Sequence, residues 1–276
     1  MKLSVITINY NNCDGLRKTI ESVVNQTWRD FEYIIIDGGS TDGSVDVIKQ
    51  YADKIDYWVS EPDKGIYNAM NKGIDVAKGE YCIFINSGDC LYNNETLNIT
   101  SVDLRDADVI TGTLMLDNGE FWTSPKEVTI QYLYAEINTL CHPASFIKTS
   151  LLRKYHYDEK LKIVSDWKFF VQILLIDGAS YKQLSSIISV FDTSGISMTD
   201  MDMCCKERQC VLENDFPKSI YSYYLYNTKD QDVNLYNIIR GSAGRRTFYT
   251  INVLLVKIWC FLNNKKWASK FPLKLN

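Results

Sequence analysis

The chain has 276 residues, a hydrophobic content of 46% and a formal net charge of −4 at pH 7. These values fit one large globular domain, or one domain with an extension, and exclude a fibrous or intrinsically disordered chain. The eight cysteines are scattered without a Cys-x-x-Cys pair, which speaks against metal–thiolate and redox sites. Because the first predicted strand follows Met1 and Lys2 directly, with no secretory leader, we expect a cytoplasmic protein with reduced thiols.

The first hundred residues are predicted to alternate strands with helices. Four apolar runs predict strands, at 3–8, 31–36, 57–60 and 81–85. The segments between them carry apolar residues at helical spacing, at 16–27, 45–51 and 66–77. Strands separated by helices of this length predict a mostly parallel, Rossmann-like sheet flanked by helices, which is an α/β fold.

Each of these strands is followed by a polar cluster. The four clusters lie at 9–11, 37–42, 61–64 and 86–89. Parallel strands end at the same edge of a sheet, where α/β folds bind their ligands, so we expect one composite pocket. Its residues are acids and amides, and no Gly-x-Gly-x-x-Gly, Walker loop or nucleophile elbow accompanies them. That composition favours metal-assisted transfer from a phosphorylated donor.

The cluster at 86–89 is the candidate metal site. It places the side-chain oxygens of Asn86 and Asp89 three positions apart, directly after a buried strand. Mg²⁺ and Mn²⁺ prefer one or two protein oxygens together with oxygens of a substrate phosphate. The alternative is an ordinary turn, since Asn, Ser, Gly and Asp are common turn residues.

The second half of the chain is less regular. A hairpin is predicted around the turn at 117–119, with further strands at 144–147 and 180–191 and helices at 164–176 and from about 199 onward. We therefore expect a domain over 1–200, in two halves that meet near residue 100, and a helical extension over 201–276.

The extension ends in a basic tail. Residues 240–276 contain eight Lys or Arg and no Asp or Glu. The apolar, aromatic-rich stretch at 248–262 is too short and interrupted to span a bilayer, but it fits an interfacial helix on an anionic membrane. The alternative is a helix that packs on the domain or on a second copy in a homo-oligomer. We expect no nucleic-acid partner, because the basic residues are few and the body is acidic.

Several of these segments together resemble a known family. SVITINYN (4–11), SVVNQT (22–27), DGGSTDG (37–43) and NSGD (86–89) occur in the order found in family 2 glycosyltransferases, which have the GT-A fold. SEPDKGIYNAMNKG (60–73) resembles a subgroup that builds bacterial surface polysaccharides. The resemblance is dense over 3–92 and thinner to 197, and it implies a nucleotide-sugar half at 1–100 and an acceptor half at 101–200.

The resemblance implies a set of donor-side residues and a divalent metal, Mn²⁺ or Mg²⁺. Asp89 matches the metal-binding acid, while Asn86 and Gly88 stand where many relatives have a further acid, so Asn86 is the weaker ligand candidate. Tyr10 matches a ring that stacks on the base and Asp37 a contact to base or ribose, with Gly38 in place of a second acid. The implied donor-side residues are Asn9, Tyr10, Asp37, Asp63, Lys64, Asn71 and Ser87.

On the acceptor side, Asp166 matches the family's catalytic base. A carboxylate within hydrogen-bond reach is well suited to removing the proton of the attacking hydroxyl. A helix N-cap is a compatible reading of the same Asp. Trp167 is expected either to stack on an acceptor sugar or to lie in the core, and His142 either to line the acceptor side or to be structural.

The implied function is inverting transfer of a sugar from a nucleotide-diphosphate donor to a saccharide or lipid-linked acceptor, in cell-surface polysaccharide synthesis. The protein is then expected on the cytoplasmic face of the membrane. One alternative is a nucleotide-sugar-binding module without catalysis. Another is a sugar-phosphate nucleotidylyltransferase, although the Gly-rich basic loop expected of that class is absent after Ile8.

Overall fold

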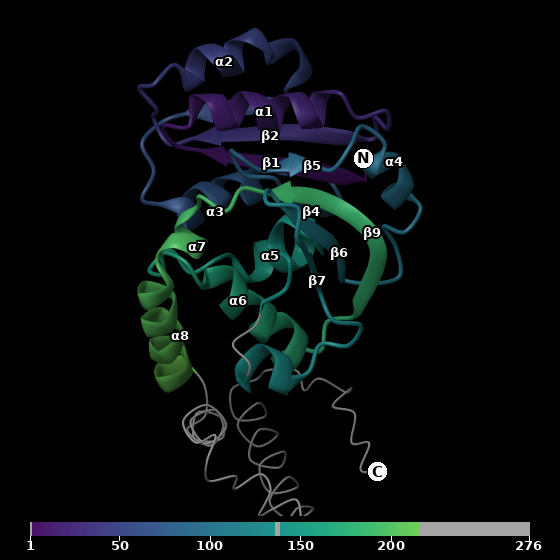
Figure 1. Ribbon diagram of the computed structural model, residues 1–276, viewed down its shortest axis with the longest axis vertical. Helices are drawn as coiled ribbons and strands as arrows, with labels where there is room; N and C mark the ends of the chain where they lie inside the picture. Colours follow the sequence, from purple (N-terminus) through teal and green to yellow (C-terminus); the bar gives the residue numbers. More distant parts are fainter. Residues whose placement is uncertain (1, 136–138, 216–276) are drawn as a thin grey trace, which may run out of the picture.

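The computed structural model describes residues 2–135 and 139–215 (Figure 1). The predicted basic tail at 240–276, and with it the membrane and oligomer predictions, lies outside the described residues. Among the residues that are described, no helix is both long and apolar enough to cross a membrane.

The first half of the chain forms four parallel strands, as predicted. These are β1 (Leu3–Asn9), β2 (Phe31–Asp37), β3 (Tyr57–Ser60) and β4 (Tyr81–Phe84). They lie in the order β3-β2-β1-β4. The helices between them are α1 (Cys13–Val24), α2 (Ser44–Gln50) and α3 (Ile66–Val76), with a 3₁₀ turn at Ala52–Lys54.

The strands β1 and β2 are buried on both faces, because their side chains alternate between two layers of helices. Val5 and Ile35 pack in the cluster that contains the apolar residues of α1 and α2. Ile6 and Ile34 pack in the other cluster, which contains those of α3. Figure 1 shows α1 and α2 on one side of these strands and α3 on the other.

The second half extends the sheet with β8 (Ser145–Lys148), β6 (Val109–Leu116), β9 (Tyr181–Phe191) and β5 (Cys90–Leu91), and β7 (Phe121–Thr123) completes the predicted hairpin with β6. β8 is antiparallel to both of its neighbours, so the sheet as a whole is mixed.

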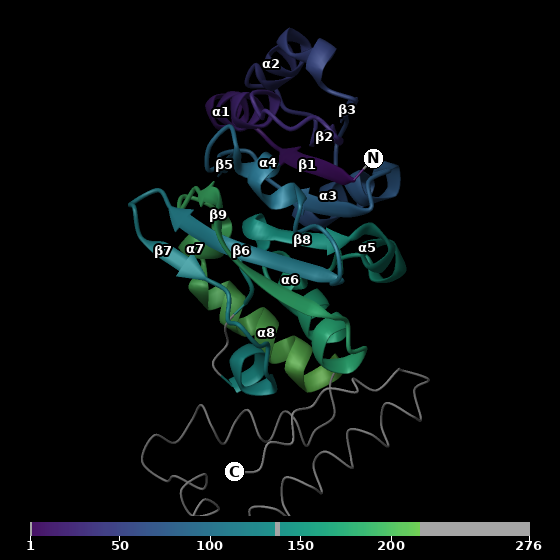
Figure 2. The ribbon, with the colours of Figure 1, turned by 90° about the vertical axis from the view of Figure 1, so that its right-hand side faces the viewer.

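The remaining helices lie mostly on the β6–β9 half of the sheet (Figure 2). They are α4 (Thr96–Ser101), α5 (Thr149–Tyr155), α6 (Ser165–Phe170), α7 (Ile196–Thr199) and α8 (Met201–Asp215), with short turns at Gln131–Ala135 and His142–Ala144. The helix predicted at 164–176 is α6 continued by a π-helical segment, Val171–Ile176. α8 is the predicted helical start of the extension.

Candidate functional site

A cavity of about 490 Å³ lies at the carboxyl ends of the strands, where the sequence predicted it. Six of the predicted site residues line it: Asn9, Tyr10, Asp63, Asn86, Ser87 and Asp89. The opposite wall comes from the segment that follows β9, including Asp192 and Ile196. The cavity therefore joins the two halves of the chain at one edge of the sheet.

Asp89 is a buried carboxylate in the wall of this cavity, with only 3% of its surface exposed. Its Oδ1 accepts a hydrogen bond of 2.9 Å from the backbone N–H of Asp192. Burial raises the pKa of Asp89 to about 7, and the nearby Asp192 carboxylate acts in the same direction. A bound cation would favour the charged form of this group.

Two amide oxygens in the same cavity wall as Asp89 are buried without a hydrogen-bond donor. They are Oδ1 of Asn86 and Oδ1 of Asn9, and both residues line the cavity. A buried acceptor without a partner costs free energy, about 1–3 kcal/mol. The two oxygens are therefore suited to receive a ligand's donors or a cation.

The carboxylate of Asp192 occupies the space beside Gly88. Gly88 has φ +106°, and a Cβ there would come within 2.6 Å of Oδ2 of Asp192. Hydrogen bonds from the side chain and backbone of Ser194 lower the pKa of Asp192, so it is the readily ionised partner of Asp89. Asp192 was not among the predicted site residues, although it directly follows a predicted strand, and strand-end residues of this sheet line the cavity.

This set of groups fits a divalent metal. Within the described part of the chain, no group of three or more His, Cys, Asp or Glu is arranged so that it could hold a metal ion. Asp89 and Asp192 supply two carboxylates, however, and Asn86 supplies a buried amide oxygen without a partner. Hard divalent cations such as Mg²⁺ bind one or two carboxylates and complete their coordination with water and substrate phosphate.

Asp37 lies behind the cavity instead of lining it. It is fully buried and accepts five hydrogen bonds, from the side chains of Asn9, Ser40 and Ser60 and the backbone of Gly39 and Ser40. Burial by itself raises the pKa of Asp37, but these hydrogen bonds outweigh it and lower the pKa below its ordinary value. In this structure Asp37 anchors the turn that supports Asn9, and its contact to base or ribose stays a prediction.

The mouth of the cavity carries Tyr10 and Asp63. Tyr10 is 67% exposed. Both side chains lie against Gly38, where an added Cβ would come within 2.4 Å of Asp63 Oδ2 and 3.1 Å of Tyr10 Cδ2. The Asp63 carboxylate thus occupies the space that a second acid at 38 would need. Lys64 is exposed and stands outside the cavity lining.

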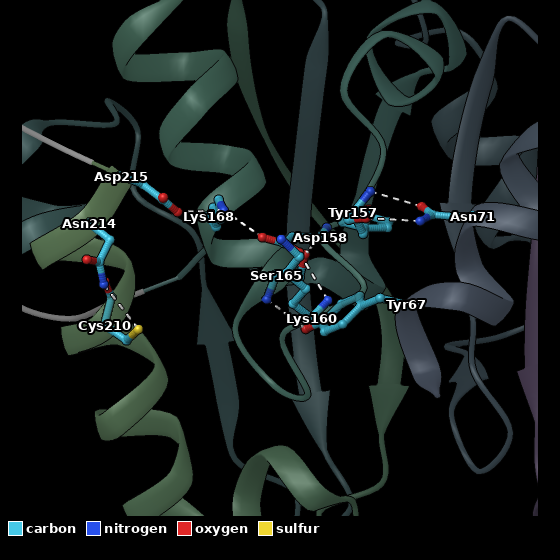
Figure 3. A network of polar contacts seen from close by, with 10 residues as sticks. All are labelled: Tyr67, Asn71, Tyr157, Asp158, Lys160, Ser165, Lys168, Cys210, Asn214 and Asp215. Carbon is cyan, nitrogen blue, oxygen red and sulfur yellow. Dashed lines mark hydrogen bonds and ion pairs between the residues drawn. The ribbon is translucent and has the colours of Figure 1, made fainter. Parts of the chain in front are cut away.

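Asn71 and Ser87 differ in their access to the cavity. Ser87 lines it and donates its hydroxyl to the carbonyl of Asn12. Asn71 is buried and exchanges two hydrogen bonds of 2.9 Å with the backbone of Tyr157 (Figure 3). It also donates to Glu159. Asn71 was predicted on the donor side, but its amide is fully used in joining α3 to the loop after α5.

Asp166 lies in the first turn of α6, where its side chain is half-buried and stands outside the cavity lining. The N-cap is Val164, so the capping interpretation of Asp166 is wrong. Its Oδ1 is 3.1 Å from the hydroxyl of Tyr67. The residue before Tyr67, Ile66, lines the cavity, so Tyr67 at the start of α3 connects Asp166 to the cavity wall.

Trp167 and His142, both predicted on the acceptor side, are core residues. Trp167 is 1% exposed and donates its Nε1–H to the carbonyl of Leu133, so its ring presents no face to a sugar. His142 Nε2 is 2.8 Å from the hydroxyl of Tyr157. Burial lowers the pKa of His142, although the charge of Asp166 opposes this. Both predictions are corrected to structural roles.

Comparison with known proteins identifies the family. The family model described as glycosyl transferase family 2 matches residues 4–158, more than half of the chain. The chain belongs to glycosyltransferase family 2. It is therefore a glycosyltransferase and an enzyme, as the resemblance implied, and membership of this family sets aside the nucleotidylyltransferase alternative.

Relatives of this family 2 glycosyltransferase are themselves glycosyltransferases. An uncharacterized glycosyltransferase of Mycobacterium tuberculosis is 31% identical over 70% of this chain and 76% of its own length. A PGL/p-HBAD biosynthesis glycosyltransferase of Mycobacterium bovis is 25% identical over 72% and 80%.

Two solved structures share the fold. TarS of Staphylococcus aureus (residues 1–349), in complex with UDP-GlcNAc, has a TM-score of 0.64 and 23% identity over 82% of this chain and 72% of that one. The mannosyltransferase PcManGT of Pyrobaculum calidifontis, in complex with GDP-Man and Mn²⁺, has a TM-score of 0.60 and 16% identity over 82% and 68%. The predicted GT-A fold is thereby confirmed.

Proposed function

We propose that this family 2 glycosyltransferase transfers a sugar, with inversion, from a nucleotide-diphosphate donor to a saccharide or lipid-linked acceptor. The observation that carries the proposal is the cavity wall, which contains the buried carboxylate of Asp89 and unpartnered amide oxygens of Asn9 and Asn86. A metal–nucleotide complex supplies the positive charge and hydrogen-bond donors that such acceptor oxygens can receive.

In the proposed donor complex the base lies at the mouth of the cavity and the diphosphate lies at the strand ends. The exposed ring of Tyr10 offers a face for stacking on the base. Asp63, beside Tyr10, offers a carboxylate acceptor to the base or ribose. The complexes of TarS with UDP-GlcNAc and of PcManGT with GDP-Man support a nucleotide-sugar donor of this class.

Asp89 and Asp192 would hold a divalent metal, with Asn86 as a third oxygen ligand. When bound, Mn²⁺ or Mg²⁺ supplies positive charge that stabilises the departing diphosphate. The Mn²⁺ complex of PcManGT supports this assignment. Ser194 holds the Asp192 carboxylate in its ionised form, ready to act as a ligand.

Asp166 is the proposed base. Inversion by a single displacement requires the acceptor oxygen to attack the anomeric carbon from the face opposite the leaving diphosphate. The carboxylate accepts the proton of that hydroxyl, while the hydroxyl of Tyr67, 3.1 Å from Oδ1, fixes its orientation. No covalent enzyme intermediate is involved.

The proposed biological role is synthesis of cell-surface saccharides at the cytoplasmic face of the membrane. A relative named as a PGL/p-HBAD biosynthesis glycosyltransferase is in line with a biosynthetic role. The eight basic residues at 240–276 would bind anionic lipids.

A thermal-shift screen of UDP-, GDP- and dTDP-sugars, each with MnCl₂ and with EDTA, tests the proposal. We expect one nucleotide to raise the melting temperature in a manganese-dependent manner. NMR of the glycosidic product should then show inverted anomeric configuration. A protein that responds to no nucleotide, or a product with retained configuration, would contradict the proposal.

A further inference from the structure

The loop that leads into Asp166 is held by side chains from two distant helices. Its backbone N–H groups at Lys162, Ile163, Val164 and Ser165 are four consecutive donors, and all four bond to side chains. Glu207 of α8 accepts the first three, and the hydroxyl of Tyr67 of α3 accepts the fourth. These four N–H groups are thus satisfied by side-chain oxygens and not by backbone carbonyls.

Glu207 makes the larger share of these contacts. Its Oε1 is 2.7 Å from the N–H nitrogen of Lys162, and its Oε2 is 2.9 Å from that of Ile163 and 3.3 Å from that of Val164. An ionised carboxylate is a stronger acceptor than a neutral group, so these bonds restrain the loop tightly. Val164 is the N-cap of α6, two residues before Asp166.

The helix that carries Glu207 is itself firmly seated on α6. Its buried face contacts the core through Cys204, Arg208, Val211 and Leu212. The guanidinium of Arg208 lies 5.2 Å from the ring centroid of Trp167, the residue after Asp166. Trp167, one of whose predicted roles was stacking on an acceptor sugar, thus packs against α8.

A polar path reinforces this seating (Figure 3). Lys168 of α6 bonds Asp215 at the end of α8 at 2.6 Å and Asp158 at 2.7 Å. The backbone N–H of Asp158 then donates to the hydroxyl of Ser165 at 2.6 Å. The path continues to Tyr67, which accepts from the N–H of Ser165 at 3.1 Å.

On the other side, Tyr67 links the same loop to the donor cavity. Its hydroxyl contacts the carbonyl of Ile163 and Oδ1 of Asp166 as well as the N–H of Ser165. Its neighbours Gly65 and Ile66 line the cavity. The loop before Asp166 is therefore fixed between the donor-side helix α3 and the extension helix α8.

We propose that Glu207 is a positioning residue for Asp166, so that α8, the start of the C-terminal extension, is part of the frame of the active site. Glu207 contacts backbone and lies outside the cavity lining, so it acts through the loop and not on substrate. The inference rests on the proposed role of Asp166 as base. It predicts that removing the Glu207 carboxylate slows transfer and leaves donor binding intact.

The test uses the full chain with the variants Glu207→Ala and Glu207→Gln, and Asp202→Asn as control. Asp202 is an exposed carboxylate on the same helix, paired with Lys206. The substrate is whichever of UDP-GlcNAc, UDP-glucose or GDP-mannose the parent hydrolyses fastest with MnCl₂, with water as acceptor.

For Glu207→Ala we expect kcat to fall about 10- to 100-fold, as displacement of a catalytic group by ~1 Å does, with the donor KM within about twofold. Glu207→Gln keeps two oxygen-acceptor contacts at most, so its kcat should lie between those of Glu207→Ala and the parent. Asp202→Asn should match the parent. An unchanged kcat in Glu207→Ala, or an equal loss in the control, would overturn the proposal.

A double-mutant cycle with Asp166→Asn separates this inference from the function it rests on. If Glu207 acts through Asp166, the double variant is no slower than Asp166→Asn alone. If Glu207→Ala lowers kcat by the same factor in the Asp166→Asn background as in the parent, Glu207 acts elsewhere and the positioning role is wrong. If Asp166→Asn itself hydrolyses donor at the parent rate, the proposed base is wrong, and the positioning role falls with it.

Discussion

The backbone N–H of Asp192 donates a hydrogen bond of 2.9 Å to Oδ1 of Asp89, although the two residues are 103 positions apart. This bond joins the end of β9 to the turn after β4. It also brings the Asp192 carboxylate next to Gly88, where the family pattern led us to expect an acid. The second carboxylate of the site is thus supplied from the other half of the chain.

Replacing that carboxylate should weaken the metal-dependent part of donor binding. For Asp192→Asn we expect Mn²⁺-supported donor affinity to fall about tenfold, or ~1.4 kcal/mol, because one anionic ligand is lost. Titration calorimetry with MnCl₂ and with EDTA measures the difference. The exposed Asp46→Asn variant serves as control. Equal affinity of Asp192→Asn and parent in MnCl₂ would rule out Asp192 as a ligand.

Asp37 should be needed for stability, with a defined pH dependence. In Asp37→Asn an amide N–H₂ faces groups that donate, so we expect a loss of about 1–3 kcal/mol at pH 7. Because folding lowers the pKa of Asp37, its contribution is present above the unfolded pKa of about 3.9 and is lost as pH falls through the folded value.

Urea unfolding of parent and Asp37→Asn between pH 3 and pH 7 checks this prediction. The difference in unfolding free energy should shrink as the pH is lowered below about 4. A difference that stays constant over this range would show that the carboxylate charge of Asp37 is not what stabilises the turn.

Tyr10 should affect donor binding without affecting stability. Its side chain is 67% exposed, so Tyr10→Ala should leave the melting temperature unchanged. Loss of ring stacking on the base should weaken nucleotide affinity by about 0.5–1.5 kcal/mol, while Tyr10→Phe keeps the ring and the affinity. Nucleotide titrations of the two variants and the parent measure these affinities. If Tyr10→Ala binds nucleotide as tightly as the parent, the base lies elsewhere.

Trp167, in contrast to Tyr10, should affect stability without affecting ligand binding. Trp167→Phe removes the Nε1–H bond to the carbonyl of Leu133, so we expect a loss of about 0.5–1.5 kcal/mol in unfolding free energy. Denaturant unfolding gives this value, and acceptor KM should remain that of the parent. A raised acceptor KM at unchanged stability would restore the sugar-stacking role.

The strand-end rule accounts for what the sequence could predict. Apolar runs separated by helices determine four parallel strands, and parallel strands bring their carboxyl ends to one edge. The rule therefore placed Asn9, Asn86 and Asp89 in one cavity. It could not indicate that Asp37 is turned inward, because the burial of a strand-end side chain depends on the hydrogen bonds that receive it.

Roles that depend on packing between distant segments could not be predicted from the sequence. Asn71 and Trp167 lie on helices whose buried faces are set by Tyr157, Leu133 and α8, which are far away in the chain. The antiparallel direction of β8 was likewise unpredictable, since a short apolar run carries no sign of its direction. Asp192 was predictable in principle, because it ends the strand predicted at 180–191.

The central claim is that Asp166 serves as the base for transfer from a donor bound in the adjacent cavity. The most direct test measures the transfer rate and the donor Kd of Asp166→Asn on the same preparation. We predict that transfer falls by at least about 10²-fold while the donor Kd stays within about twofold of the parent. Transfer at the parent rate would contradict the account.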